Sequence, residues 1–287
     1  MTVPVDLHLH STCSDGTDSP ETVVALAAAQ GLTAIALTDH DTLAGIDDAA
    51  AAASSAGIGF IAGVELSLQW DLGGMHLLVY HLGQAPGPLQ DRLAGLQDGR
   101  SGRNQLIVER LVALGWPITS DEVVEESGGG VVGRPHIAAV LVRMGAADSI
   151  SDAFDRWLAQ GRPAYVSRPR LTPAEAIILA RRSGAVPVLA HPHTIGVSAD
   201  EYRTAFRNLA ELGLAGIEAY YSEYPEELRL HLADIATGLG LIATGGSDYH
   251  GTYKPGLSVG TGHGDLRVPD EVVDAIGAVA RPEELRQ

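Results

Sequence analysis

The chain alternates short apolar runs with alanine-rich stretches, and this alternation constrains the fold more than any other feature of the sequence. Apolar runs of this length, bounded by polar residues or glycine, are typical of buried strands. The runs lie at Val3–Leu7, Ala34–Leu37, Phe60–Val64, His76–Tyr80, Val186–Ala190, Gly216–Ala219 and Leu241–Thr244. The helical stretches lie at Pro20–Gln30, Ile46–Ala56, Pro173–Ser183, Ala199–Leu212 and Glu226–Leu239. This order predicts an α/β fold with a parallel sheet or barrel, in which functional residues gather at the carboxyl ends of the strands.

The alternation stops between Pro86 and Ser167, where no run favours a strand. Helices are expected there at Leu89–Leu114, Asp121–Glu126, Pro135–Met144 and Ser151–Gln160. The sequence therefore predicts a barrel formed by residues 1–85 and 168–287, with residues 86–167 as a helical insertion that caps the active site. The alternative is that these helices continue the outer layer of the barrel. Thr172 and Pro173 predict the cap of the next barrel helix, and residues 281–287 are expected to form a loose end.

Composition restricts the partners and the compartment of the chain. Of 287 residues, 45% are hydrophobic, which is enough for a full core, and 36 acidic against 19 basic residues give a net charge of −17. Because nonspecific affinity for nucleic acid comes from cations on phosphates, binding of duplex DNA is not expected. The single cysteine, Cys13, indicates a reducing compartment. With no recognisable signal peptide and no apolar run of about 20 residues, we expect a cytoplasmic protein that does not bind membranes.

Six of the eleven histidines lie at or near the ends of expected strands. Residues two apart on a strand point to the same face, and such pairs occur at His8 with His10, at His191 with His193 and at Asp248 with His250. In a barrel these ends converge, so nine side chains are expected to meet: His8, His10, Asp15, His40, Glu65, His76, His191, Asp248 and His250. A set of imidazoles and carboxylates without thiolates suits Zn, Mn or Fe. Nine ligands exceed the needs of one ion, which predicts two or three divalent ions bridged by a carboxylate.

These motifs together resemble those of the polymerase-and-histidinol-phosphatase (PHP) superfamily. The resemblance rests on Asp6-Leu7-His8-Leu9-His10-Ser11 with Asp15-Gly16, Thr38-Asp39-His40-Asp41, Gly63-Val64-Glu65, Ala190-His191-Pro192 and Gly246-Ser247-Asp248-Tyr249-His250. It implies a distorted (β/α)7 barrel with three metal ions. Gly133-Arg134-Pro135-His136 in the insertion is similar to a subgroup that contains 3′,5′-bisphosphonucleotide phosphatases and 5′–3′ exoribonucleases.

The resemblance also implies how the ligands are shared. One ion would take His8, His10, Glu65 and Asp248; a second would take Glu65, His76 and His191; a third would take Asp15, His40 and His250. Glu65 would bridge. Three divalent ions carry six positive charges and three carboxylates return three. The excess positive charge suits a phosphate monoester dianion better than a neutral amide or ester.

The expected reaction is hydrolysis of a phosphoester by a hydroxide that bridges two ions. Arg134 and His136, at the start of a helix, are expected to bind the substrate phosphate, with Arg134 stabilising the charge that develops on it. His193 is expected to bind phosphate or to donate a proton to the leaving oxygen. Asp39 and Glu218 each fit either a role in orienting a ligand or no role at all. The arginines at 100, 103, 168 and 170 could guide RNA or form solvated surface.

The substrate stays open between a small nucleotide, such as a 3′,5′-bisphosphonucleotide or AMP, and the 5′ end of a short RNA. Two other functions compete with this one. The first is a histidinol-phosphate phosphatase of the same superfamily. The second is a metal-stabilised PHP module without catalytic activity, which the complete set of ligand positions disfavours.

Overall fold

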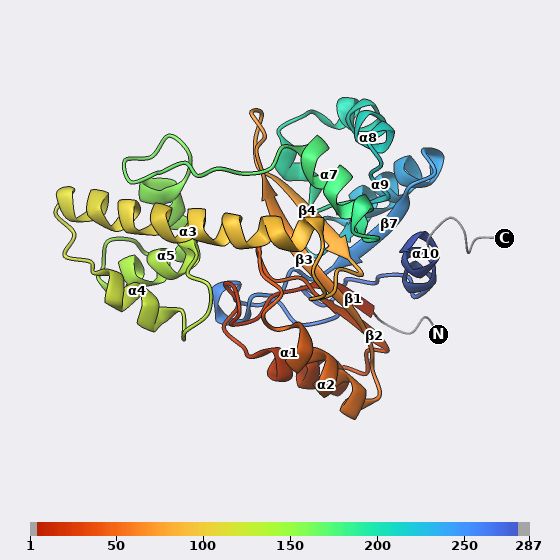
Figure 1. Ribbon diagram of the computed structural model, residues 1–287, viewed down its shortest axis with the longest axis horizontal. Coiled ribbons are helices and arrows are strands. Elements are labelled where there is room, and N and C mark those ends of the chain that lie inside the picture. Colours follow the sequence, from red (N-terminus) through yellow and green to blue (C-terminus); the bar gives the residue numbers. More distant parts are fainter. Residues whose placement is uncertain (1–4, 281–287) are drawn as a thin grey trace.

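Seven short strands form one sheet in the computed structural model, which describes residues 5–280. The strands pair in chain order and curl into a nearly closed barrel (Figure 1). They are β1 (Val5–Leu9), β2 (Ala34–Leu37), β3 (Gly59–Leu68), β4 (Met75–Tyr80), β5 (Val186–Leu189), β6 (Gly216–Tyr221) and β7 (Ile242–Gly246). Every residue of β1, β2 and β5 is buried, as expected for strands covered on both faces. The predicted α/β barrel is confirmed.

The predicted parallel arrangement fails at one strand. β4 runs antiparallel to both β3 and β5, whereas the other neighbouring strands pair in parallel. Only residues 69–74 connect β3 to β4, and a parallel crossover needs a dozen residues or more. This reversal puts the beginning of β4, and with it His76, at the end of the barrel where the parallel strands finish.

The barrel closes between β1 and the segment that follows β7. The Asp248 amide donates a hydrogen bond to the His8 carbonyl at 2.9 Å, and the His10 amide donates to the Tyr249 carbonyl at 3.0 Å. Gly246 allows this approach, because a Cβ added there would lie only 2.4 Å from the Cβ of His8. The buried carboxylate of Asp6 accepts hydrogen bonds from the Ser247 amide at 2.9 Å and the Gly260 amide at 2.7 Å. Closure therefore fixes the two strands that carry four predicted metal ligands.

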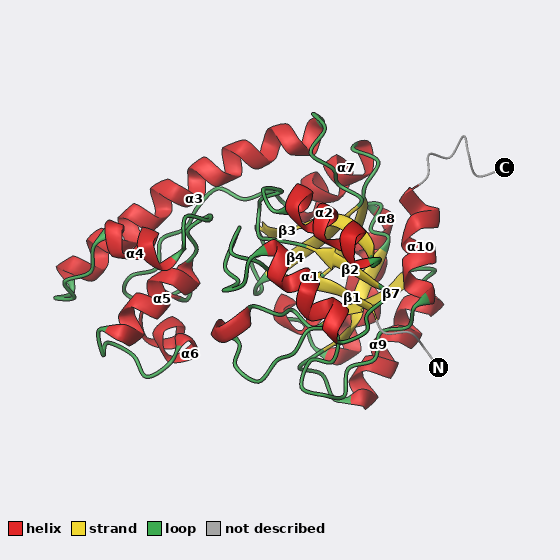
Figure 2. Cartoon of the chain, turned by 90° about the horizontal axis from the view of Figure 1, so that it is seen from below, coloured by secondary structure: helices red, strands yellow, loops and turns green. Residues whose placement is uncertain are grey.

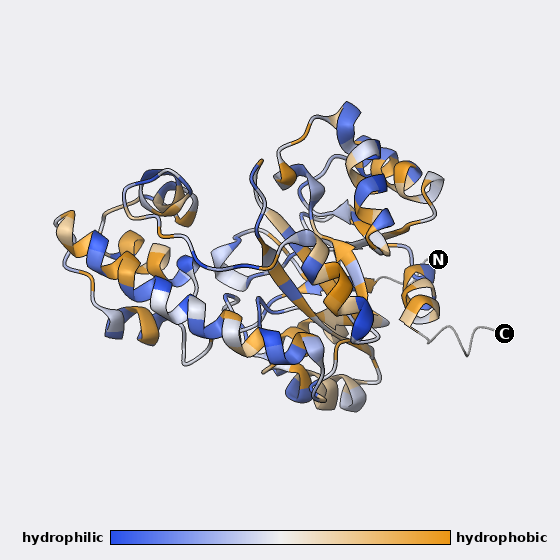
Figure 3. Ribbon diagram, turned by 45° about the horizontal axis from the view of Figure 1, so that its top comes forward, coloured by the Kyte–Doolittle hydropathy of each residue, from blue (hydrophilic) through white to orange (hydrophobic). Residues whose placement is uncertain are grey.

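Helices surround the barrel, with apolar faces turned inward (Figures 2 and 3). They are α1 (Pro20–Ala29), α2 (Ile46–Ala56), α7 (Pro173–Arg182), α8 (Tyr202–Glu211), α9 (Glu226–Gly238) and α10 (Glu271–Ala280). The cap predicted for α7 is present, since the Thr172 hydroxyl accepts from the Glu175 amide. The sequence reasoning did not anticipate α10, and the loose end expected at 281–287 lies outside the described residues. Among residues 5–280, no helix combines the length and apolar character that crossing a membrane requires.

Helix α3 (Pro88–Ala113) leaves the barrel and carries a second group of helices to one side of it (Figure 1). Leu89, Leu93 and Leu96 in its first half belong to the barrel core. Ile107 and Leu111 in its second half belong to a separate apolar core. That core also takes residues from α4 (Ser120–Glu126), α5 (Arg134–Arg143), α6 (Ile150–Ala153) and the π-helical turn η1 (Phe154–Leu158). One continuous helix thus joins two hydrophobic cores.

Candidate metal centre

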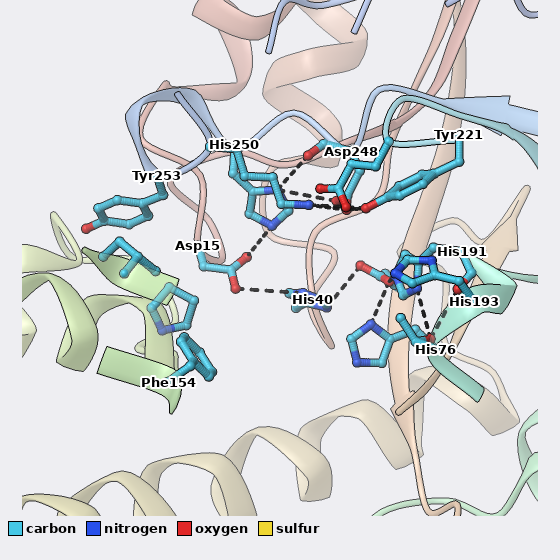
Figure 4. Close-up of a pocket in the computed structure, with 16 residues that line it drawn as sticks. Asp15, His40, His76, Phe154, His191, His193, Tyr221, Asp248, His250 and Tyr253 are labelled. Atoms are coloured by element: carbon cyan, nitrogen blue, oxygen red, sulfur yellow. Dashed lines mark hydrogen bonds and ion pairs between the residues drawn. The ribbon is translucent and has the colours of Figure 1, made fainter. Parts of the chain in front are cut away.

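The nine side chains expected to bind metal converge at one end of the barrel. β1 contains His8, and the loop after it provides His10 and Asp15. His40 follows β2, β3 contains Glu65, and His76 is the second residue of β4. The remaining three, His191, Asp248 and His250, follow β5 and β7. Seven of the nine line a cavity of about 340 Å³ at the barrel mouth (Figure 4), while His8 and His10 are fully buried beneath it.

Glu65 occupies the middle of this cluster. Its Oε1 lies 2.8 Å from His76 Nδ1 and 3.0 Å from His191 Nε2. Its Oε2 lies 3.1 Å from His10 Nε2 and 3.2 Å from both His8 Nε2 and His40 Nδ1. One buried carboxylate therefore faces five imidazoles, with its two oxygens turned toward different groups of donors.

Four donor atoms lie close together. His8 Nε2 and His10 Nε2 lie 3.1 Å apart, each lies 3.1–3.2 Å from Glu65 Oε2, and each lies 3.4 Å from Asp248 Oδ1. An ion bound tetrahedrally at about 2.0–2.2 Å separates its ligand atoms by roughly 3.3–3.6 Å. These five distances are thus close to those of a divalent-ion site.

Two further groups of donors surround the first. His10, Asp15, His40 and His250 bring their ligand atoms together, and so do His40, Glu65 and His76. Asp15 lies 3.4 Å from His250 Nε2 and 3.7 Å from His40 Nε2. His40 therefore belongs to two groups, whereas the family resemblance implied that it serves one.

The electrostatics of the cluster favour cations. Burial opposes ionisation of Glu65, but the imidazoles of His40, His8 and His76 outweigh it and hold the pKa of that carboxyl well below its usual range. For Asp248, Lys254 and His8 likewise outweigh burial and hold its pKa well below the usual range. His40 Nδ1 is buried 3.2 Å from Glu65 Oε2 but makes no hydrogen bond within residues 5–280. Charged carboxylates beside such an imidazole nitrogen fit divalent ions.

Glu218 and Asp39, whose roles the sequence left undecided, form hydrogen bonds that hold the ligand-bearing residues of this cluster. His8 Nδ1–H donates to Glu218 at 2.9 Å, and the His191 amide donates to the other carboxylate oxygen of Glu218 at 2.7 Å. Asp39 accepts from the Ser11 amide at 2.8 Å and from the Ser14 hydroxyl at 2.6 Å, which fixes the loop leading to Asp15. Both residues orient ligand-bearing segments, in the manner usual around metal sites.

Comparison with known proteins agrees with this geometry. The family model described as the PHP domain matches residues 6–239. The chain belongs to the PHP family. It is 34% identical to the 5′-3′ exoribonuclease Rnm of Salmonella typhimurium over 85% of this chain and 84% of the relative. It is 31% identical to a 3′,5′-nucleoside bisphosphate phosphatase of Chromobacterium violaceum over 89% and 90%. A putative metal-dependent phosphoesterase from Bifidobacterium adolescentis superposes with a TM-score of 0.84 at 30% identity, over 98% of both chains.

These matches confirm the predicted PHP family, the barrel fold and the kinship with metal-dependent phosphoesterases and nucleotide-acting hydrolases. Together with the donor clusters they support divalent metal ions as the cofactor.

One wall of the PHP cavity contains polar groups that the sequence reasoning did not fully identify. His193 faces the cavity and is held by Tyr224, whose hydroxyl lies 2.9 Å from His193 Nδ1. Tyr221 donates to Asp248 at 2.8 Å, and Lys254 forms an ion pair with the same carboxylate. Lys254 was missed. It is the single lysine of the chain and follows the Asp248–His250 motif by four residues, a signal visible in the sequence.

Arg134 and His136, which the sequence predicted to bind phosphate, do not line the cavity that contains the metal ligands. Arg134 lines a smaller cavity next to the metal cluster, and its guanidinium stacks on Phe154. His136 is buried and lines neither cavity; its Nδ1 accepts a hydrogen bond from the Gly133 amide at 2.9 Å. The ring thereby caps the start of α5, a position where backbone amides need acceptors.

The arginines weighed as RNA guides or solvated surface are largely enclosed. Arg100, Arg103 and Arg168 are buried, and Arg170 is half-buried. All four line the same small cavity as Arg134. The expectation of solvated surface is therefore wrong for the three buried arginines, since each is held between α3 and the segment that precedes α7.

Proposed function

We propose that this PHP chain is a phosphoesterase that removes a phosphate from small nucleotides or from the 5′ end of short RNA, and that it uses three divalent ions, of Mn, Fe or Zn. The observation that carries the proposal is the position of Glu65, whose two oxygens face different imidazole groups as a bridging ligand does. The nine residues named above would hold the ions. When bound, such ions supply an activated water molecule and positive charge for the phosphoryl oxygens.

The protein's own groups would position the substrate. His193 is exposed to the cavity while Tyr224 fixes its ring, so its Nε2 is placed to bind a phosphoryl oxygen or to donate a proton to the leaving oxygen. Lys254 adds a positive charge on the same wall. Arg134 reaches a phosphate group from the adjoining cavity. His136 would act on the substrate indirectly, by fixing the helix that carries Arg134.

Residues 86–167 would form the cap over this site. Pro135, Ile150 and Phe154 from these residues line the cavity, and Figure 4 shows Phe154 on the side away from His191 and His193. Their separate apolar core supports their folding as one unit. A cap of this kind would exclude water and leave room for a nucleotide rather than for duplex DNA, which a net charge of −17 also disfavours. A nucleotide substrate agrees with the cytoplasmic location inferred from the single cysteine.

The test is phosphate release, in the presence of Mn²⁺, from adenosine 3′,5′-bisphosphate, AMP, histidinol phosphate and a short 5′-phosphorylated RNA. We expect turnover of the bisphosphate or the RNA, and loss of that turnover in Asp248→Asn. Asp234→Asn, an exposed residue of α9, is the matched control and retains wild-type rates.

Each alternative predicts a different outcome of the same assay. Turnover restricted to histidinol phosphate would identify the rival phosphatase. Stoichiometric metal binding without turnover of any of the four compounds would contradict the proposal and favour the metal-stabilised module.

A further inference from the structure

The short 3₁₀ turn η2 (Pro192–Ile195) brings His193 to the metal cavity. It directly follows the metal ligand His191, whose φ of 22° is rare for a residue other than glycine. Figure 4 shows His193 beside His191 on one side of the cavity. A turn of four residues makes few hydrogen bonds of its own. Contacts from other elements must therefore hold His193 in place.

Tyr224 contacts both the backbone and the ring of His193. Its hydroxyl oxygen accepts a hydrogen bond from the His193 amide at 3.0 Å, and the same oxygen lies 2.9 Å from His193 Nδ1. The two rings meet edge to face, with their centroids 5.4 Å apart. Tyr224 is only 5% exposed and packs in the barrel core, so its own position is fixed. One buried side chain thus orients the imidazole from behind.

The hydroxyl hydrogen of Tyr224 decides which nitrogen of His193 carries the proton. The His193 amide is itself a donor, so it cannot accept this hydrogen. The hydroxyl forms no other hydrogen bond within residues 5–280, which leaves Nδ1 of His193 as its acceptor. A proton on Nδ1, in the other tautomer or in the cation, would leave a buried hydroxyl hydrogen without a partner, which is costly. The imidazole is therefore neutral and carries its proton on Nε2.

The connection between β3 and β4, residues 69–74, holds the end of η2. The Trp70 indole Nε1–H donates to the Ile195 carbonyl at 2.8 Å. The Gly74 amide donates to the Thr194 carbonyl at 2.8 Å. Both carbonyls at the end of the turn are therefore satisfied by this one connection, as buried backbone groups require. The turn that carries His193 is thus held by two elements that are distant in sequence.

We propose that Tyr224 and Trp70 are positioning residues for His193, and that they present its Nε2–H to the substrate as a hydrogen-bond donor. This inference rests on the proposed function, because it takes His193 to contact a phosphoryl oxygen. A nitrogen that carries a proton has no free lone pair, so Nε2 does not act as a base. Of the two roles considered for His193, binding of a phosphoryl oxygen is favoured, because loss of the Nε2 proton would leave an anionic imidazole. A fixed donor of this kind stabilises negative charge on the phosphoryl group.

The first test reads the tautomer directly, by long-range ¹H–¹⁵N NMR of the full chain in metal-free and in Zn²⁺-loaded form. The variant His193→Ala identifies the His193 signals by their absence. We expect the proton on Nε2 in the wild-type protein and a mixture of both tautomers in Tyr224→Phe, which removes only the hydroxyl. Tyr202→Phe is the matched control, because Tyr202 is buried in the same core and its hydroxyl forms no hydrogen bond within residues 5–280. This control should leave the His193 signals unchanged.

The second test compares kcat/KM for adenosine 3′,5′-bisphosphate, with Mn²⁺, in single and double variants. Tyr224→Phe should lower kcat/KM about tenfold, as loss of a group that orients a functional side chain does. The same substitution made in His193→Ala should have little further effect, because the hydroxyl acts only through the imidazole.

Trp70→Phe tests the second positioning residue. It should lower kcat/KM about fivefold, as expected for one lost hydrogen bond, and should also have little further effect in His193→Ala. Trp157→Phe is the matched control, since Trp157 is likewise half-buried and its indole donates to a carbonyl, that of Ala146, in the separate helical core. It should leave kcat/KM unchanged.

Three results would overturn the inference. The first is a proton on Nδ1 of His193 in the wild-type protein. The second is an unchanged His193 signal in Tyr224→Phe. The third is a loss of kcat/KM in Tyr224→Phe and Trp70→Phe that is equally large with and without His193, since that loss would reflect a general structural defect. Absence of turnover by the wild-type protein, with the proton on Nε2 as expected, would instead contradict the proposed function and leave the assignment of the tautomer standing.

Discussion

The metal centre and a smaller cavity, which we call the arginine pocket, share walls at the barrel mouth but differ in almost every physical respect. The arginine pocket is lined by Arg100, Arg103, Arg134, Arg168 and Arg170. The metal centre surrounds Glu65 with imidazoles and carboxylates whose donor atoms converge on common points. In the arginine pocket the guanidiniums of Arg100 and Arg168 contact Asp41, and several guanidinium nitrogens make no hydrogen bond within residues 5–280. The first cluster suits cations, and the second carries an excess of positive charge.

The two sites also differ in the elements that carry them. The metal ligands lie on barrel strands or in the segments that directly follow them, so the hydrogen bonds of the sheet hold their starting points. The arginines come from a helix stripe, a helix start and an extended segment. Removing a group from the metal centre should therefore act on catalysis and metal content. Removing one from the arginine pocket should act on anion binding and stability.

The largest effect is expected for Glu65→Gln. The amide removes the charge of the central carboxylate and leaves one acceptor oxygen instead of two. We expect phosphate release to fall by about a thousandfold, in line with the several kcal/mol that metal ions contribute to such transition states. Metal content per chain should fall as well. Both are measured by a phosphate assay and by elemental analysis of dialysed protein.

The matched control for this variant is Glu211→Gln, an exposed glutamate of α8. It should keep wild-type activity and metal content. If Glu65→Gln retained its full metal content and most of its activity, the bridging role would be contradicted.

The next largest effect is expected for Asp41→Asn, which removes the counter-ion of the arginine pocket. Breaking a buried ion pair leaves Arg100 and Arg168 without compensation and should lower the free energy of unfolding by about 3 kcal/mol. Added phosphate or sulfate should restore part of this loss, because the anion replaces the missing carboxylate. Urea unfolding with and without phosphate measures both effects. An equal loss in both buffers would indicate that no anion reaches these arginines.

A smaller effect is expected for Glu218→Gln, which weakens the support behind His8. The glutamine still accepts one hydrogen bond but no longer carries the charge that orients the imidazole. Metal affinity should fall about 10- to 100-fold, as for other residues that hold metal ligands. A titration of activity against Mn²⁺ should shift accordingly while saturating activity is largely recovered. Glu227→Gln, exposed on α9, provides the control. If the titration of activity against Mn²⁺ did not shift, Glu218 would have only a packing role.

The metal centre was largely predictable because its signals are local. Pairs of histidines two residues apart, such as His8 and His10, report a strand face directly. The position of His76 was the weak point. His76 lies near the start of its strand and joins the other ligands only because β4 runs antiparallel to β3. The short connection before β4 is the physical reason for that reversal.

The arginine pocket was not predicted because its meaning depends on contacts that are distant in sequence. Arg100 and Arg168 meet at Asp41 from two segments separated by dozens of residues. One local signal was available. Arg100 and Arg103 fall on the buried stripe that runs from Leu89 to Leu111, so helix periodicity alone marks them as enclosed. Reading that periodicity would have excluded a solvated surface.

The smallest effect is expected for His136, which belongs to neither the metal centre nor the arginine pocket. His136 was expected to bind phosphate, yet its Nδ1 accepts from the Gly133 amide and caps α5. His136→Ala should therefore lower stability by about 1 kcal/mol, as loss of a helix cap does, and should change kcat/KM only through the position of the neighbouring Arg134. His231→Ala, at an exposed position in α9, is the control. His136→Asn should recover most of the stability, because an amide oxygen can accept the same hydrogen bond. A loss of substrate affinity in His136→Asn as large as that in Arg134→Ala would instead place the imidazole on the phosphate, and His136 would then belong to the arginine pocket.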